Sequence, residues 1–457
     1  MNFFGTDGIR GVANVHPLTP EFAMRIAIAA SRILTCENKK LVVIGADTRR
    51  SSNMLSYASG AALMSMGFEV LNLDVIPTAG LSWITKKLGA AFGIMISASH
   101  NPFWDNGIKI FSGDGYKLSE ETEMKIEKEL FNEGAERPTH DKIGCVVRSN
   151  SFIVDPVSEY AEYVASLIEK SHATDGKKKI KLVIDGANGA ASYLVKRIFS
   201  DRFNVVSMNC QPDGANINFN CGSTHLESLA ARVKEEHANI GIAFDGDSDR
   251  ALFVDEHGNI VDGDFIMAML AVDLKERGKL KNNLIVGTVM TNLGFIHAMK
   301  NLNIEFLCTA VGDRNVLNEM IKKGGIIGGE QSGHIIMLEE NHTGDGLITA
   351  VHVLNLMKRT DKKLSELSKV MKKYPQVLIN IQVLGDKNAY KKNEKINCAI
   401  TEAEEKFKNR GRVLIRTSGT ENIVRVMIEG EDKKEISESA EKIARVIREN
   451  CQENSIN

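Results

Sequence analysis

The sequence predicts an α/β protein made of three related α/β domains with mainly parallel mixed sheets and a smaller C-terminal α+β domain. The first observation is a repeated alternation of apolar strand, turn and helix, which favours right-handed crossovers between parallel strands. The second is a recurring start of basic residues, apolar strand, glycine turn and helix at 39–52, 177–192 and 281–294. Related domains and chance recurrence of a common motif both explain this repeat.

The third observation is a change of pattern near Tyr374. A strand at 376–383, a long polar helix, strands within 412–428 and a last helix follow, which is typical of a small α+β domain. A polar, turn-rich segment marks the first boundary near residue 150. The length of 457 residues alone suggests three domains, with two or four close behind, whereas the pattern along the chain predicts four, at 1–150, 151–255, 256–372 and 373–457.

Several helices have recognisable first residues. Thr19 precedes an apolar helical pattern at 20–34 and is the expected N-cap. Ser119 is expected to cap a helix that reaches about Phe131, and Asp155-Pro156 opens another, because proline suits the first helical position. The other elements expected early in the chain are a strand at 41–44, a helix at 51–66 and a strand at 69–73.

Composition excludes several classes of function. A net charge of −2 and a pI near 6.6 show no excess of positive charge of the kind that binding to nucleic acid or a membrane requires. Seven scattered cysteines contain no C-x-x-C pair, so they indicate reduced thiols in the cytoplasm rather than a zinc site or disulfide framework. Asp7 and Arg10 interrupt any signal-peptide pattern, and no apolar run reaches transmembrane length.

A stretch at 93–111, GIMISASHNPFWDNGIKIF, is predicted to display a hydroxyl nucleophile. A buried strand is expected to end in small residues, with one turn at Asn101-Pro102 and a second at Asn106-Gly107. Ser99 lies where the strand opens into the loop. Lys109 is expected to return beside it, as a positive charge or, with a depressed pKa, as a base. A simple turn serine is the alternative.

The segment 240–258 carries three alternating carboxylates, Asp245, Asp247 and Asp249, between two apolar strands. Oxygen-only ligands that converge on one point suit Mg²⁺. An EF-hand is the rival because Glu256 falls at the twelfth position, but Arg250 stands where that loop requires glycine. A solvated acidic turn is the other alternative.

Two further loops carry polar groups suited to a phosphosugar. In IIGGEQSGHIIM, at 326–337, Glu330 can accept from vicinal hydroxyls and His334 has a pKa suited to proton transfer. In VLIRTSGTENIVRVMIEG, at 413–430, two arginines flank a hydroxyl-rich turn that could cradle phosphate. The alternatives are a structural turn and an ordinary hairpin loop. The second loop lacks the glycine spacing and lysine of a P-loop.

Together these motifs resemble the α-D-phosphohexomutase family, from Phe3 to the C-terminal phosphate loop. The motifs are GTDGIRG (5–11), ISASHNP (96–102), DGDSDR (245–250), GEQSGH (329–334) and RTSGTEN (416–422). Gln331 resembles the amino-sugar branch of that family, because the phosphomannomutase/phosphoglucomutase branch usually has methionine there. One departure is Asn315, where the family pattern has tyrosine.

The resemblance implies a phosphoryl-transfer centre. Ser99 matches the serine that carries the phosphoryl group, and its phosphate would complete the shell of a Mg²⁺ ion. The implied metal ligands are Asp245, Asp247 and Asp249. The residues implied to neutralise the phosphoryl group or assist proton transfer are Arg10, His100, Lys109, Arg250 and His334. Glu330 and Ser332 resemble readers of sugar hydroxyls. The implied cradle for the phosphate that is not reacting consists of Arg416, Ser418, Gly419, Thr420 and Arg425.

The resemblance also implies an arrangement and an activity. Four domains would surround one central cleft, the last of them mobile. The implied reaction interconverts glucosamine 6-phosphate and glucosamine 1-phosphate for UDP-N-acetylglucosamine and cell-wall synthesis, with glucosamine or glucose 1,6-bisphosphate as intermediate or activator. Rivals are the same reaction on glucose or mannose phosphates, a metal-dependent phosphatase, and a non-catalytic sugar-phosphate sensor. The expected partner is a small phosphosugar, not nucleic acid or a membrane, and a homodimer is one candidate assembly.

Overall fold

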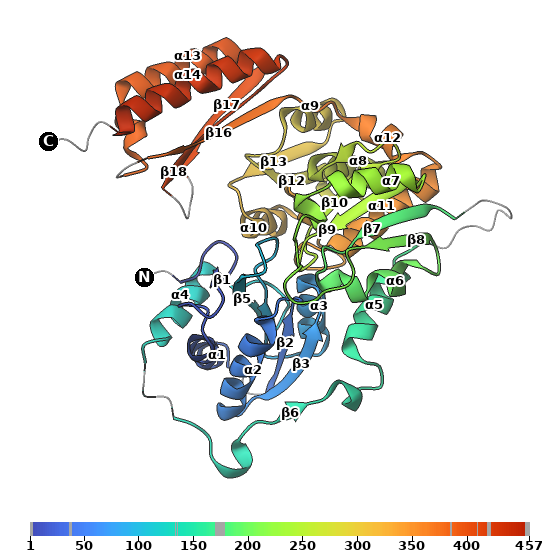
Figure 1. Cartoon of the computed structure of the whole chain (residues 1–457), viewed down its shortest axis with the longest axis vertical. Helices are drawn as coiled ribbons and strands as arrows, with labels where there is room; N and C mark the ends of the chain where they lie inside the picture. The colour runs from blue at the N-terminus through green and yellow to red at the C-terminus, as the bar shows by residue number, and fades with distance from the viewer. Residues whose placement is uncertain are drawn as a thin grey trace. The chain divides into compact units, whose positions relative to one another are not determined.

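The computed structural model describes most of the chain in two compact units. The described residues are 3–35, 39–132, 134, 136–169, 179–383, 386–408, 410–417 and 422–452. Unit 1 comprises Met1–Met290 and Leu302–Val370, and unit 2 comprises Thr291–Asn301 and Met371–Asn457. In Figure 1, unit 2 contains α9 and the orange-to-red elements β16, β17, β18, α13 and α14. Each unit is described by itself.

The first sheet has six strands in the order β1-β5-β4-β2-β3-β6. Its strands are β1 (Ile9–Val12), β2 (Leu41–Ala46), β3 (Glu69–Val75), β4 (Phe92–Ile96), β5 (Asp105–Ser112) and β6 (Val146–Val147). The central strands pair in parallel, whereas β5 is antiparallel to both β4 and β1. The helices of this region are α1 (Pro20–Ile33), α2 (Ser52–Ser65), α3 (Thr78–Lys87) and α4 (Glu120–Glu129).

The second sheet has five strands in the order β11-β10-β9-β7-β8. They are β7 (Lys181–Asp185), β8 (Asn204–Met208), β9 (Ile240–Phe244), β10 (Ala251–Asp255) and β11 (Ile260–Val261). β8, β7 and β9 run parallel, and β10 is antiparallel to β9. The neighbouring helices are α5 (Pro156–Ser166), α6 (Val195–Phe199) and α7 (Glu227–Glu235). The acidic motif therefore lies between two strands, as predicted.

The third sheet has four strands in the order β13-β12-β14-β15. They are β12 (Leu284–Thr288), β13 (Glu305–Thr309), β14 (Ile327–Gly329) and β15 (Ile335–Met337). Its helices in unit 1 are α8 (Gly263–Glu276), α10 (Asp313–Lys323), α11 (Gly346–Thr360) and α12 (Leu364–Leu367). Only β15 is antiparallel to its neighbour. The prediction of mixed, mainly parallel sheets is confirmed.

The three sheets share one core topology. Each contains a run of four strands, β5-β4-β2-β3, β10-β9-β7-β8 and β15-β14-β12-β13, with the same order and pairing sense. The strands of the recurring sequence start, β2, β7 and β12, occupy equivalent positions. This correspondence favours related domains over chance recurrence, whereas the predicted domain boundaries stay predictions. The antiparallel hairpins β4–β5, β9–β10 and β14–β15 are also equivalent, and each carries one of the predicted functional loops.

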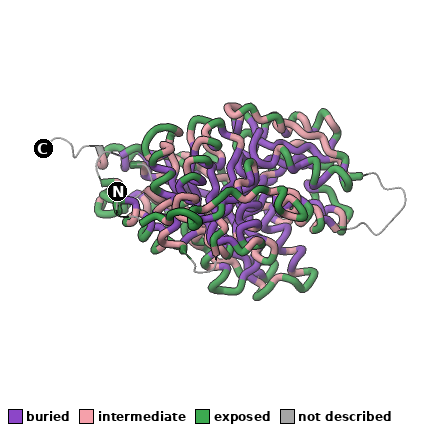
Figure 2. The backbone as a smooth tube through the Cα atoms, turned by 90° about the horizontal axis from the view of Figure 1, so that it is seen from below, coloured by how far each residue is buried: buried purple, intermediate pink, exposed green. Residues whose placement is uncertain are grey.

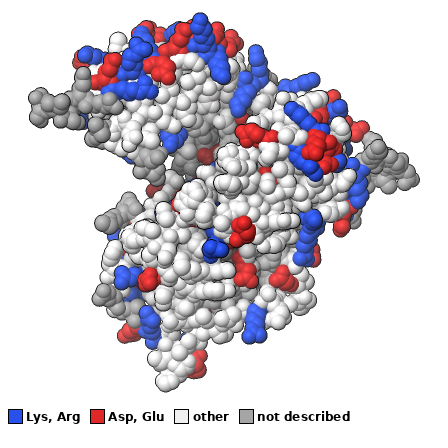
Figure 3. All heavy atoms as spheres, viewed as in Figure 1, with Lys and Arg blue, Asp and Glu red and all other residues white. Residues whose placement is uncertain are grey.

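Unit 2 contains a three-stranded antiparallel sheet in the order β16-β18-β17. Its elements are α9 (Leu293–Asn301), β16 (Gln376–Gln382), α13 (Glu394–Phe407), β17 (Gly411–Thr417), β18 (Ile423–Gly430) and α14 (Lys433–Gln452). Figure 3 shows basic and acidic side chains mixed over the visible face of α13 and α14, where Lys442 pairs with Glu402. The predicted small α+β domain is confirmed as a fold.

Local signals placed most helix starts correctly. The Thr19 side chain accepts a hydrogen bond from Phe22 N, and Ser119 and Asp155 cap α4 and α5 in the same way. These bonds satisfy first-turn N–H groups that have no partner within the helix. The predicted turn at Asn106-Gly107 is wrong, because these residues lie inside β5. β1 pairs with that segment, and this contact between distant segments extends the strand to Asp105.

Burial follows the sheets. Figure 2 shows purple, buried segments running through the interior of the described chain. β4, β9 and β12 are buried along their whole length, which fixes the hairpin loops that follow β4 and β9. No described cysteine forms a disulfide, and no described helix has both the length and apolar character needed to cross a bilayer.

Candidate active site

Ser99 lies in the loop between β4 and β5, with its hydroxyl enclosed by polar groups. The residue is fully buried and has a left-handed backbone, with φ of 54°. Its Oγ donates to Asp245 Oδ2 at 2.7 Å and lies 3.3 Å from His100 Nδ1. Ser99 N donates to Ser97 Oγ at 2.9 Å. The predicted nucleophile and the first predicted metal ligand are therefore in direct contact.

Arg49 holds the serine loop, which we define as residues 99–105. Its guanidinium donates to the carbonyl oxygens of Ser99 (2.8 Å), Asn101 (2.9 Å), Asp105 (3.0 Å) and Pro102. Arg49 is itself fixed by a buried ion pair with Asp47, 2.8 Å from Nε to Oδ2. Charge-assisted, multidentate bonds of this kind define one loop geometry. The sequence reasoning missed Arg49, although its place after β2, where parallel strands end beside β4, was a usable signal.

The three aspartates gather in the loop between β9 and β10. One carboxylate oxygen from each lies within 4.8 Å of the others, and all three residues are buried. Gly246 permits close approach to the serine loop, because a Cβ there would lie 2.6 Å from Ser99 O. Glu256 instead accepts a hydrogen bond from Ser365 Oγ and is outside the cluster, so the EF-hand interpretation is wrong.

The cluster fits a hard divalent cation. Burial and the carboxylates of Asp249 and Asp247 raise the pKa of Asp245 well above its ordinary value. A cation among these oxygens would offset that repulsion. Asp247 Oδ1 and Asp249 Oδ1 are buried oxygens without a hydrogen-bond partner among the described residues. Oxygen donors that are buried, convergent and partly unpartnered are the ligand set that Mg²⁺ prefers.

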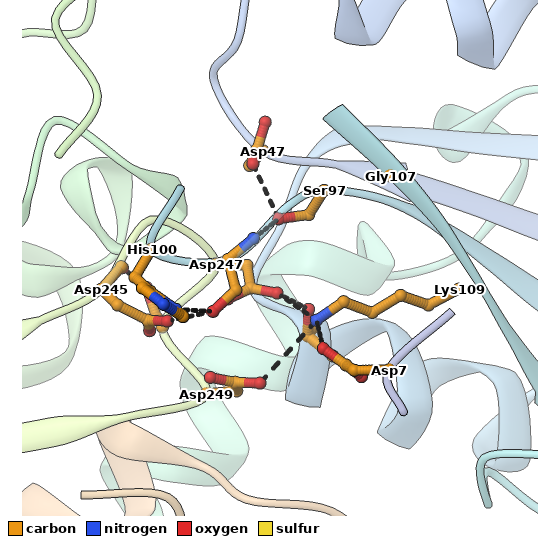
Figure 4. Close-up of polar contacts among 12 residues, drawn as sticks. Asp7, Asp47, Ser97, His100, Gly107, Lys109, Asp245, Asp247 and Asp249 are labelled. Carbon is orange, nitrogen blue, oxygen red and sulfur yellow. Dashed lines mark hydrogen bonds and ion pairs between the residues drawn. The ribbon is translucent and has the colours of Figure 1, made fainter. Parts of the chain in front are cut away.

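Lys109 reaches the same cluster from β5. Its Nζ lies 2.8 Å from Asp247, 2.9 Å from Asp7 and 3.8 Å from Asp249 (Figure 4). Burial alone would lower the pKa of Lys109, but Asp247 and Asp7 raise it above its usual value. Of the two roles expected for Lys109, a fixed positive charge is favoured in this state over a base with a depressed pKa.

Asp7 connects the N-terminal motif to this centre. It accepts an ion pair from Arg10 and lies 2.5 Å from the Nζ of Lys117, which also pairs with Asp313. Although burial opposes it, Lys109 and Lys117 hold the pKa of Asp7 well below its usual range. Asp7 and Lys117 were not predicted as functional residues, because their contacts span up to 196 residues of sequence and no local pattern reports them.

His100 and Arg250 complete the polar wall around Ser99. Burial, followed by the charges of Arg250 and Arg10, lowers the pKa of His100 to about 4. The imidazole is therefore neutral at physiological pH and can exchange a hydrogen bond with the Ser99 hydroxyl. Arg250 lies 3.9 Å from Asp249 through Nε, which has no hydrogen-bond partner among the described residues. This guanidinium is suited to a phosphoryl oxygen.

His334, from the β14–β15 hairpin, faces the acidic cluster. Its Nδ1 lies 3.5 Å from Asp249 and its Nε2 lies 3.7 Å from Asp313. Burial lowers the pKa of His334, but Asp249 and Asp313 raise it overall. Gly344 N donates to Nε2 at 3.2 Å, and a Cβ at Gly344 would lie 2.5 Å from the ring. The imidazole is thus held closely against the cluster.

The polar loop, residues 330–334, closes the β14–β15 hairpin. Gly333 N donates to Glu330 O at 3.0 Å, and Gly333 has a φ of 90°. The Glu330 carboxylate accepts from Gly312 N at 3.1 Å, and Gln331 donates to Asp264 at 3.2 Å. Ser332 Oγ is enclosed and has no hydrogen-bond partner among the described residues. The loop therefore offers a hydroxyl group that a ligand could hydrogen-bond.

The fourth predicted motif lies in unit 2. Arg416 on β17 stands directly opposite Arg425 on β18 in the antiparallel register. Side chains of such a pair lie on the same face of a sheet, within reach of one another, so both guanidinium groups could bind one anion. The other three cradle residues, Ser418, Gly419 and Thr420, lie outside the described residues.

Comparison with known proteins decides the family. Four models described as phosphoglucomutase/phosphomannomutase domains match the chain: α/β/α domain I at 1–137, domain II at 158–258, domain III at 262–374 and the C-terminal domain at 378–446. The chain belongs to the phosphoglucomutase/phosphomannomutase family. Two curated relatives are the phosphoglucosamine mutases of Brevibacillus brevis and Caldicellulosiruptor saccharolyticus, each 48% identical. The alignments cover 98% and 97% of this chain and 99% and 98% of those proteins.

Solved structures of the family have the same fold. A Burkholderia thailandensis phosphoglucomutase/phosphomannomutase family protein superposes with a TM-score of 0.81 at 22% identity, covering 98% of this chain and 97% of that one. Aspergillus fumigatus N-acetylphosphoglucosamine mutase, in complex with GlcNAc-6P and magnesium, gives a TM-score of 0.67 at 18% identity, covering 98% and 96%. The predicted fold class and the resemblance to this family are confirmed.

Proposed function

We propose that the chain is a Mg²⁺-dependent phosphoglucosamine mutase that interconverts glucosamine 6-phosphate and glucosamine 1-phosphate. One observation carries the proposal: Ser99 Oγ lies 2.7 Å from Asp245, within an acidic cluster that also binds the Lys109 ammonium. A nucleophile, a cation site and a fixed positive charge at one point are the requirements of phosphoryl transfer. A sensor would not need the nucleophile, and the family's relatives are mutases.

The first transfer starts from Ser99 as its phosphate ester. A sugar hydroxyl attacks the phosphorus in line, the new P–O bond forms, and the bond from phosphorus to Ser99 Oγ breaks. The hydroxyl proton passes to a nearby base, and the departing Ser99 Oγ takes up a proton to become the free hydroxyl. The product is the 1,6-bisphosphate, and the serine is free. Arg10 and Arg250 are proposed to bind the phosphoryl oxygens during this step, and His100 or His334 to handle the proton.

The second transfer is the reverse reaction at the other end of the sugar. The bisphosphate turns around, Ser99 Oγ attacks the other phosphate, and the isomeric monophosphate leaves. The cradle of Arg416, Ser418, Gly419, Thr420 and Arg425 is proposed to hold whichever phosphate is not reacting. Because it must accept both ends, it should recognise phosphate and little else. Sugar identity is then recognised by Glu330 and Ser332 of the polar loop.

Asp245, Asp247 and Asp249 are the proposed ligands of Mg²⁺, with a phosphate oxygen on Ser99 as a fourth. The bound ion supplies charge neutralisation for the phosphoryl group. The protein groups around it exclude water, since all three carboxylates and Ser99 are buried. Exclusion of water is what separates a mutase from a phosphatase.

The sugar is assigned from two observations. Relatives 46–48% identical over nearly the full chain are phosphoglucosamine mutases. Gln331 also follows the amino-sugar branch, and its amide is held by Asp264. We further propose that glucosamine or glucose 1,6-bisphosphate serves as activator, and that the enzyme works in the cytoplasm, where its described cysteines stay reduced.

A substrate comparison tests this function. Initial rates would be measured with the 6-phosphates of glucosamine, glucose and mannose, together with release of inorganic phosphate. The proposal expects the highest kcat/KM for glucosamine 6-phosphate and little phosphate release. Preference for mannose or glucose phosphate would reassign the sugar but keep the chemistry. Net phosphate release without isomer formation would instead indicate a phosphatase, and binding without turnover a sensor.

A further inference from the structure

Thr78, at the first position of α3, contacts Asp247 in the loop between β9 and β10, although the two residues are 169 positions apart in sequence. It is fully buried. Its Oγ1 donates to Asp247 Oδ2 at 2.6 Å, and its backbone N–H donates to the Asp247 carbonyl oxygen at 3.0 Å. One residue of the first sheet's region thus binds both the main chain and the side chain of a proposed metal ligand.

The two oxygens of Asp247 have different surroundings. Oδ2 accepts from Thr78 Oγ1 and from Lys109 Nζ, the latter at 2.8 Å. Oδ1 is buried and has no hydrogen-bond partner among the described residues. Two donors on one oxygen fix the rotation of the carboxylate and leave the other oxygen for a ligand. A buried carboxylate oxygen without any partner would otherwise be costly.

We propose that Thr78 is a positioning residue that orients Asp247 for Mg²⁺ through its hydroxyl. This inference rests on the proposed metal site. Groups that hydrogen-bond to metal ligands fix ligand orientation, and their loss typically weakens metal affinity by about 10- to 100-fold. Lys109 cannot replace Thr78, because its Nζ is shared with Asp7 and Asp249. Without the hydroxyl, the Asp247 carboxylate is held from one side only and can rotate.

The backbone of Thr78 is held independently of its hydroxyl. The preceding residue, Pro77, gives α3 no side-chain cap, so the first N–H groups of the helix need other acceptors. The Asp247 carbonyl oxygen serves the N–H of Thr78. This backbone bond can form with any amino acid except proline at position 78. A variant that lacks only the hydroxyl should therefore keep the contact between α3 and the β9–β10 loop.

The test compares Mg²⁺ affinity in full-length, dephosphorylated Thr78→Val and Thr78→Ser by titration calorimetry. Thr78→Val removes the hydroxyl at nearly constant volume and should weaken Mg²⁺ binding by about 10- to 100-fold. Thr78→Ser retains the donor and should stay within about 3-fold of the wild type. Thr85→Val is the matched control: Thr85 is buried on the same helix, but within the described residues its hydroxyl donates to Leu81 O of α3 and not to the acidic cluster. It should bind Mg²⁺ like the wild type.

The outcomes separate this inference from the function it rests on. Mg²⁺ binding by Thr78→Val equal to that of Thr85→Val would overturn the role of Thr78, provided that Asp247→Asn abolishes binding. If the wild type and Asp247→Asn give the same titration, the proposed metal site itself fails. Thr78→Ala, which introduces no new methyl group, carries the same expectation if Thr78→Val does not fold. The shift in melting temperature caused by Mg²⁺ provides a second readout of affinity.

Discussion

The serine loop (99–105) and the polar loop (330–334) occupy equivalent positions in two sheets of the same topology, yet they are built differently. Arg49 satisfies four carbonyl oxygens of the serine loop from within the protein. The polar loop keeps an enclosed hydroxyl, Ser332 Oγ, without a hydrogen-bond partner in the described part of the chain, and its Glu330 carboxylate accepts from the N–H of Gly312. The loop proposed to perform chemistry is preorganised, whereas the loop proposed to recognise the sugar keeps hydrogen-bonding groups available for it.

The largest expected effect tests the chemical role of the serine loop. Ser99→Ala should lower kcat by at least about 10³-fold, because it removes the hydroxyl proposed to carry the phosphoryl group. Substrate should still bind, since the hydroxyl is not part of the sugar or phosphate subsites. A coupled assay, intact-mass measurement of phosphorylation and calorimetry would check this. Activity within 10-fold of the wild type would remove Ser99 from the mechanism.

The next effect tests whether the loop needs its rigid support. Arg49→Lys keeps the charge beside Asp47 but cannot reach four carbonyl oxygens, so the serine should be misplaced and kcat should fall by about 100-fold. The melting temperature should fall as well, because the loop carbonyl oxygens lose charge-assisted bonds from Arg49, although Asn218 Nδ2 also donates to those of Ser99 and Asn101. Arg50→Lys is the control, as Arg50 is exposed beside it. Unchanged kcat in Arg49→Lys would show that the contacts serve folding alone.

A smaller effect concerns the anion subsite proposed in unit 2, to which neither loop contributes. Arg416→Ala should raise KM by about 10-fold through loss of a charge-assisted bond worth roughly 1.5–3 kcal/mol, with little change in kcat. Arg410→Ala, which removes an exposed arginine paired with Glu435 in the same unit, is the control. A fall in kcat with constant KM would place Arg416 in the chemical step instead.

The smallest effect sharpens the contrast between the loops. Ser332→Ala should reduce kcat/KM by about 2- to 10-fold, the value of one neutral hydrogen bond to substrate. Unlike Arg49→Lys, it should leave the melting temperature of the free protein unchanged, because the hydroxyl has no hydrogen-bond partner to lose among the residues that the structure describes. Thermal unfolding with and without substrate would measure both quantities. Destabilisation of the free protein by Ser332→Ala would contradict the proposed difference.

Sequence patterns reported what is local. Helix caps at Thr19, Ser119 and Asp155 were predicted because the capping residue and the helix it caps are adjacent. The acidic loop was predicted because apolar strands flank it on both sides. The proposed roles of its residues, and of the other site residues, stay predictions.

The residues that sequence reasoning missed act over long separations. Arg49 lies 50 residues from Ser99, and Thr78 lies 169 residues from Asp247, so no periodicity or motif spacing links them. The same cause explains the wrong turn at Asn106-Gly107. Asn-Gly favours a turn by itself, but pairing with β1 stabilises an extended strand there. Tertiary contacts, rather than local preference, determined these three cases.

The backbone at Ser99 limits which amino acids could serve as the proposed phosphate carrier. A φ of 54° is unfavourable for β-branched residues, so threonine, an equally good alcohol, would strain this position. Glycine would suit the conformation but offers no oxygen. Serine is therefore the amino acid that combines a hydroxyl with this left-handed backbone at the lowest strain, and Ser99→Thr should be poorly tolerated at this position.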